Sequence, residues 1–152
     1  VGASIITNAA TLAISAAPIA GTNATLTNSS ALWVQAGAAR FDGRVLEIQG
    51  ADVASAAGAI ALGNDGNTFE ITGTNNITLI SNLGWRNGAI VTLIFTTTAT
   101  LTSGTATSGT DITLILAGGI PFVATANDVV VLCLSEMGGT QAWREVSRSL
   151  NA

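Results

Sequence analysis

Apolar and polar residues alternate along this chain in the short runs that are typical of β-strands. Thr, Val and Ile dominate the runs, and Gly or Asn interrupts them about every eight to twelve residues. We therefore expect an all-β fold, an antiparallel β-sandwich or jelly roll of about ten short strands. The expected strands are 31–35, 44–49, 59–62, 68–72, 77–81, 89–96, 98–102, 112–117, 129–135 and 142–146.

The first thirty residues differ from the rest of the chain. Residues 1–30 are a low-complexity mixture of Ala, Thr, Ser and Asn with one proline, Pro18, and no charged residue. Such a segment lacks the large side chains that build a core, so we expect an extended N-terminal arm that lies on another surface. A β-sandwich domain over 31–152 would follow it. The alternative is that residues 1–30 include an ordinary first strand of the sandwich.

Two of the expected strands are apolar on both faces. In one of them, alternate positions carry Val91, Leu93 and Phe95 on one face and Ile90, Thr92 and Ile94 on the other. In the second, they carry Val129, Val131 and Cys133 on one face and Val130, Leu132 and Leu134 on the other. A sheet that faces water is normally polar on one side, so we expect a cover for the second face.

Either the N-terminal half of the chain or a neighbouring subunit could provide that cover. Charged residues make up only 9% of the chain, against an average of about 25%. An isolated domain this apolar would expose adhesive patches, which favours the subunit. We therefore expect a homo-oligomer, and a homotrimer first among the possible assemblies.

The charge balance also bears on other partners. The net charge is -4, and there are five basic residues, all of them arginine. Nucleic acid and anionic membranes attract clustered basic residues, so neither is expected as a partner. The apolar runs are also too short for a membrane-spanning helix of about 20 residues.

Residues with catalytic or metal-binding chemistry are scarce. The chain has no histidine, which removes serine triads and most zinc sites. Its single cysteine, Cys133, has no candidate base and is expected to be a small buried hydrophobe. The run Asn64-Asp65-Gly66-Asn67 with Glu70 lacks the alternating ligands of a calcium loop and predicts a turn. We expect no enzymatic activity, no cofactor and no bound metal.

The large apolar residues are candidates for packing anchors. Tryptophans are more often core or interface residues than ligand platforms, although stacking on a sugar is the alternative. The chain has one local concentration of charge, at Arg40, Asp42, Arg44 and Glu47. These residues could contribute to a contact with another protein, but we expect them to form surface ion pairs with one another. The candidate subunit-interface or packing anchors are Trp33, Trp85, Trp143, Ile90, Ile94, Val130 and Leu132.

An ordered series of partial motifs runs through residues 63–151. The series comprises Phe69-Glu70-Ile71-Thr72-Gly73-Thr74, residues 77–80, Gly84-Trp85, Gly88, residues 91–95, Thr100-Leu101, residues 124–128 and residues 143–148. This series resembles a module of tailed-bacteriophage structural proteins. The module is found at the distal ends of tail fibres and tailspikes, and a stand-alone version is similar to capsid decoration, or cement, proteins.

The resemblance implies a trimeric β-sandwich that binds a protein surface or a host receptor without catalysis. Because the chain is one module long, it favours a structural virion protein that binds the major capsid protein on the outer capsid surface and stabilises the head. The alternative is the distal receptor-binding module of a tail fibre or tailspike. In that case a host-surface glycan is the expected ligand.

Overall fold

The computed structural model describes residue 14 and residues 17–26, 30–105 and 109–151. The fold is all-β, as the sequence predicts, with one short 3-10 helix, η1 (Ala117–Gly119). The strands of the described residues are β1 (Val53–Ala54), β2 (Gly58–Ile60), β3 (Thr68–Thr72), β4 (Asn76–Ser81), β5 (Ile90–Phe95), β6 (Ala99–Leu101), β7 (Asp111–Ile115), β8 (Phe122–Ala124), β9 (Val129–Met137) and β10 (Thr140–Ser149).

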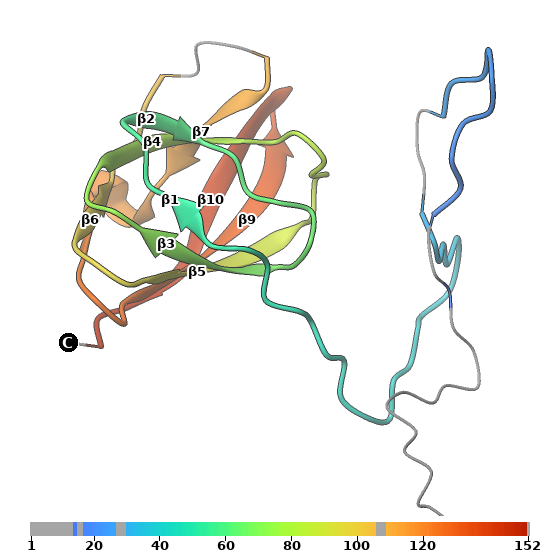
Figure 1. The fold of residues 1–152 in the computed structure, drawn as a ribbon, viewed down its shortest axis with the longest axis horizontal. Helices are drawn as coiled ribbons and strands as arrows, with labels where there is room; N and C mark the ends of the chain where they lie inside the picture. The colour runs from blue at the N-terminus through green and yellow to red at the C-terminus, as the bar shows by residue number, and fades with distance from the viewer. Residues whose placement is uncertain (1–13, 15–16, 27–29, 106–108, 152) are drawn as a thin grey trace, which may run out of the picture. The chain divides into compact units, whose positions relative to one another are not determined.

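The strands form two layers around one core. Their hydrogen-bonded order is β1-β3-β5-β9-β10-β7-β4-β6-β8, and β2 pairs with β4 off this path. The path turns over at β7, so that β3, β5 and β9 lie on one side of the core and β2, β4 and β6 on the other (Figure 1). This arrangement is consistent with a β-sandwich.

Strand pairing is mixed, which corrects the expectation of an antiparallel sheet. Among the described strand pairs, five are parallel and four are antiparallel. From β1 to β6 the chain winds as a coil that alternates between the two layers. Each strand therefore pairs with the strand two before it, in the preceding turn of the coil, and runs in the same direction. A short hairpin appears later, between β9 and β10, where Gly138 and Gly139 adopt φ of 59° and 78°.

Two expected strands are wrong. Neither 31–35 nor 44–49 forms a strand, and of these residues Gln49 alone makes an isolated parallel bridge, to Thr68. The structure instead contains β1 and β8, which the sequence pattern did not predict. Apolar and β-branched residues favour a strand only where a neighbouring strand is available to pair with it.

The chain divides into two compact units, Val1–Val45 and Leu46–Ala152. The described residues of the first unit contain no strand and are almost all exposed. An ion pair joins Arg40 Nε to Asp42 Oδ1 at 2.6 Å. Most of residues 1–30 lie outside the described ranges, so the arm stays a prediction.

The second unit holds a continuous hydrophobic core. Its aromatic rings meet edge to face, with centroid separations of 5.9 Å between Trp85 and Trp143 and 5.7 Å between Phe95 and Phe122. Such pairs stabilise a fold beyond their buried area. The largest fully buried side chains are Trp143, Phe69, Phe95, Phe122, Ile71, Ile77, Ile80, Leu93, Leu101, Leu114, Leu132 and Leu134. This core fixes which face of each strand points outward.

Candidate subunit interface

The inward faces of β5 and β9 belong to the core. Val91, Leu93, Val130 and Leu132 are all 0% exposed. Two of the predicted anchors, Val130 and Leu132, are therefore packing residues within one subunit. Their backbones pair β9 with β5, with Leu93 directly opposite Val130.

The outward faces of the same two strands are apolar as well. Opposite one another lie Ile90 and Cys133, Thr92 and Val131, and Ile94 and Val129. Ile90 is 52% exposed, and the other five side chains are half-buried. Apart from the hydroxyl of Thr92, these directly opposed side chains form a continuous apolar strip, because cross-strand neighbours lie about 4.5–5.5 Å apart. We call these six residues the outer β5/β9 face.

Polar residues border the outer β5/β9 face on both sides. On β10, Arg144 lies opposite Cys133 and its Nε donates to Ser135 Oγ at 2.8 Å. On β3, Glu70 lies opposite Ile94 and accepts a hydrogen bond from Gln49 Nε2 at 3.1 Å. An apolar centre with a polar rim is the usual composition of a protein–protein interface.

The three tryptophans occupy different environments. Trp143 is fully buried, whereas Trp85 is partly buried and packs edge to face against Phe69 and Trp143. Trp33, in the first unit, is 75% exposed. Trp143 is thus a core residue, Trp85 closes one end of the core, and Trp33 is open to contact with another molecule.

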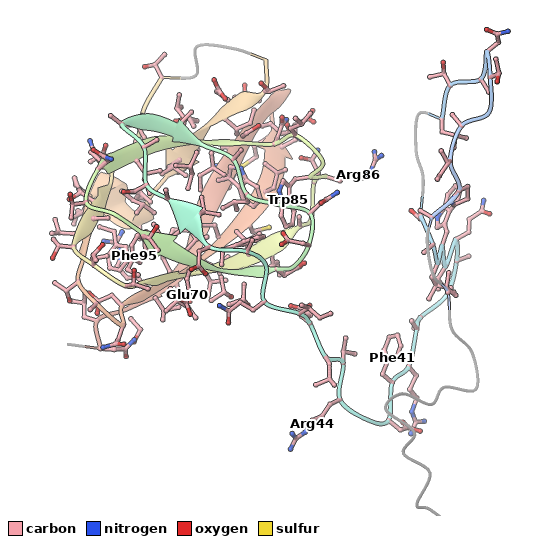
Figure 2. The ribbon with its side chains drawn as sticks, in the orientation of Figure 1. Phe41, Arg44, Glu70, Trp85, Arg86 and Phe95 are labelled. Carbon is pink, nitrogen blue, oxygen red and sulfur yellow. The ribbon has the colours of Figure 1, made fainter. Side chains whose placement is uncertain are left out.

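Hydrogen-bonded polar side chains tie the loop between β4 and β5, where Figure 2 shows Trp85 and Arg86, to β9 and β10. Asn82 donates to Gln141, Gln141 donates to Asn87 at 2.7 Å, and Asn87 donates to Glu136 at 3.1 Å. These groups bind one another across β9 and β10. They fix the loop instead of presenting a ready set of donors for a ligand.

The buried carboxylate of Glu145 forms an ion pair with Arg148 on the same strand, β10. The Arg148 guanidinium lowers the pKa of Glu145, whose side chain is 2% exposed and accepts from Ala117 N at 2.9 Å. Glu145 in turn raises the pKa of Arg148, which lies 5.1 Å from the centroid of the Phe122 ring. The ion pair is therefore part of the packing between β10 and β8.

Asp128, which is 1% exposed, closes the turn before β9. Backbone hydrogen bonds from Thr125 N at 2.8 Å and Asn151 N lower the pKa of this carboxyl. The negative charge is matched by donors that tie the end of the chain to the body. Asp128 and Glu145 therefore have structural roles.

The parts of the chain that the structure describes contain no group of three or more Cys, Asp or Glu side chains that could hold a metal ion. No helix in these parts is long and apolar enough to span a membrane. Comparisons with protein-family models, with curated proteins and with solved structures each found no match. The fold and the outer β5/β9 face thus define an all-β protein with an apolar strip on one outer sheet surface.

The anchors predicted from the sequence, as interface or packing residues, divide between the two faces. Of the predicted anchors, Ile90 and Ile94 lie on it, while Val130 and Leu132 point into the core. The residues that belong with Ile90 and Ile94 are Val129, Val131 and Cys133. The alternation along β9 separates the two sets, but it does not say which set faces outward.

Proposed function

We propose that this chain is a structural virion protein, a decoration (cement) protein that binds the outer surface of a phage capsid as a homotrimer and stabilises the head. The observation that carries the proposal is the outer β5/β9 face. Five of its six side chains are apolar, the six form three cross-strand pairs, and within the second unit they are less buried than the core residues. Its partner in the capsid would be the major capsid protein.

Burial of this strip would drive trimer formation. Completing the burial of each half-buried Ile or Val side chain contributes roughly 1 kcal/mol, at about 25 cal/mol per Å² of apolar surface. The four Ile and Val side chains of this face on every subunit provide enough to offset part of the entropy lost on association. The remaining affinity would come from the polar rim and from further contacts between subunits.

A trimer would bind the head through three copies of one contact. Linked weak contacts act together, so that affinity rises by orders of magnitude without a strong individual site. With charged residues at only 9% of the chain, the contact would be made mainly by uncharged groups. Binding to heads is then expected to depend little on salt concentration.

The direct test is to mix the purified chain with expanded, undecorated phage heads. The proposal predicts saturable uptake and a higher melting temperature of the heads. Val131→Asp, on the outer β5/β9 face, should abolish uptake because it prevents trimer formation. Val123→Asp, at a 58% exposed position on β8, is the matched control. Heads that take up no wild-type protein would rule the proposal out.

The second candidate function is the distal receptor-binding module of a tail fibre or tailspike. The observation that favours it is Trp33, whose exposed ring could stack on a host-surface glycan. Glycan-array binding by the wild-type chain, lost in Trp33→Ala and retained in Phe41→Ala, would support this candidate. Binding to heads but to no glycan would leave the decoration protein.

A further inference from the structure

A seven-residue pattern occurs twice in the chain. Residues 42–48 read Asp-Gly-Arg-Val-Leu-Glu-Ile, and residues 65–71 read Asp-Gly-Asn-Thr-Phe-Glu-Ile, 23 positions later. The turns of the coil vary in length, since Ile71 pairs with Phe95, 24 positions further on, and with Val53, 18 positions before it. Residues 42–48 therefore repeat the side-chain pattern of β3 ahead of β1, the first strand of the coil.

The two copies of the pattern lie in opposite environments. In the second copy, which contains most of β3, Phe69 and Ile71 are 0% exposed. In the first copy, the equivalent Leu46 and Ile48 are 84% and 74% exposed. Figure 2 shows Glu70 on β3 and Arg44 on a chain segment outside any strand. Residues 42–48 thus carry the apolar side chains of a buried strand, but these side chains are exposed.

The first coil of the fold has an open edge. Among the described residues, β1 pairs with β3 alone and β2 with β4 alone, so each has one side without a neighbouring strand. Unpaired backbone groups at a sheet edge favour the addition of another strand. Coiled β-folds also require a cover over the last coil.

The chain's own residues 42–48 cannot pair in parallel with its own β1. Asn67 N donates to Ile48 O at 3.3 Å, Gly50 N to Thr68 O at 2.8 Å and Ala51 N to Asp65 Oδ2 at 2.7 Å. These bonds hold residues 48–51 along β3, directly ahead of β1. A parallel neighbour needs a crossover of about a dozen residues, and only residues 49–52 separate Ile48 from Val53.

We propose that residues 42–48 of one subunit add a parallel strand to the open β1 edge of a second copy of this chain. Leu46 and Ile48 then cover the end of the neighbour's core beside Val53, as Phe69 and Ile71 do one coil further on. The contact is head-to-tail, and closure after three subunits gives a trimer. The inference rests on the proposed homotrimer and adds a second contact between its subunits to the one at the outer β5/β9 face.

The first test is the double variant Leu46→Asp/Ile48→Asp, studied by sedimentation equilibrium. Both side chains are exposed in the single chain, so the body should stay folded, with unchanged near-ultraviolet circular dichroism from Trp85 and Trp143. We expect association to weaken by at least about 100-fold, since two carboxylates would enter an apolar contact. The matched control is Ile19→Asp/Leu32→Asp, which alters two exposed residues outside 42–48 and should leave the trimer intact.

The second test is a disulfide between chains. In the proposed register Ile48 lies beside Val53, as Ile71 does, which places Glu47 beside Asp52 within disulfide range. Co-expression of a tagged Glu47→Cys chain with an untagged Asp52→Cys chain should give a cross-linked pair of one tagged and one untagged chain. Each variant expressed alone, and Leu32→Cys with Asp52→Cys, should give no such pair.

The outcomes separate this inference from the proposed function. A trimer that survives Leu46→Asp/Ile48→Asp and forms no Glu47–Asp52 cross-link would overturn strand exchange and leave the decoration protein standing. A trimer that shows the cross-link but ignores phage heads would overturn the proposed function and leave strand exchange standing. A wild-type chain that sediments as a monomer would overturn both.

Discussion

The two faces of β5 and β9 have nearly the same composition and very different burial. Val91, Leu93, Val130 and Leu132 point inward and are 0% exposed, while the outer β5/β9 face remains partly open. The second layer of the fold covers the inner face and completes its burial. The outer face has similar chemistry, and the described residues of the second unit cover it only in part, so we propose that a second copy of the chain completes its burial.

The largest expected effect is on the inner face. Leu132→Ala should lower the free energy of unfolding by about 2–5 kcal/mol, because it leaves a cavity between the layers. Val131→Ala, one residue away on the outer face, should change the stability of the monomer by less than about 1 kcal/mol. Urea denaturation of both variants measures the difference. Equal decreases in the free energy of unfolding of the two variants would contradict the difference in burial between the two faces.

The next effect is on association through the outer face. Val131→Asp should weaken the trimer by at least about 2 kcal/mol per subunit, because a carboxylate without a partner would be buried in the contact. The monomer should stay folded, since the side chain faces outward. Analytical ultracentrifugation measures the change, with Val123→Asp as the control. An unchanged trimer would show that the outer β5/β9 face is not the interface.

A third effect concerns the ion pair that packs β10 against β8. Glu145→Gln should lower the free energy of unfolding by about 1–3 kcal/mol, because half-buried Arg148 loses a charged acceptor. Glu136→Gln, at an exposed position on β9, should cost less than about 1 kcal/mol. Thermal unfolding compares the two. A larger effect at Glu136 would contradict the structural role given to Glu145.

Stability should also fall in acid. The pKa values of Glu145 and Asp128 are lower in the folded chain than their ordinary values of 4.5 and 3.8. Their stabilising contribution is therefore complete above about pH 4.5 and is lost as the pH falls through the lower, folded pKa values. Melting temperatures between pH 6 and pH 2, repeated with Glu145→Gln and Asp128→Asn, should show a smaller decrease in both variants.

The smallest effect is expected in the first unit. The ion pair of Arg40 and Asp42 is highly exposed on both sides, and exposed pairs contribute about 0–1 kcal/mol. Arg40→Gln should change neither the melting temperature nor the trimer measurably. A clear loss of association in this variant would place Arg40 in a subunit contact.

Much of the fold could be predicted from the sequence. Eight of the ten strands, from β2 to β7 and then β9 and β10, lie within or overlap expected ranges. Parallel pairing could not be predicted, because the pattern along one strand does not record which strand lies beside it. Residues 31–35 and 44–49 show the same limit. They have the composition of strands, but among the described residues their one strand pairing is the isolated bridge from Gln49 to Thr68.

The candidate interface was predictable only in part. Alternation identified β5 and β9 as apolar on both faces, but it gave no direction, so Val130 and Leu132 were grouped with Ile90 and Ile94. A polar face normally reveals which side meets water, and these strands have none. Direction follows instead from the position of the second layer, which is a property of the whole fold.

Sedimentation equilibrium of the wild-type chain tests most directly whether the outer β5/β9 face is a subunit interface. The proposed trimer predicts a mass three times that of the chain at micromolar concentration, and a single-chain mass for Val131→Asp. A wild-type monomer across the same concentration range would contradict the account, because the apolar outer face would then be open to water.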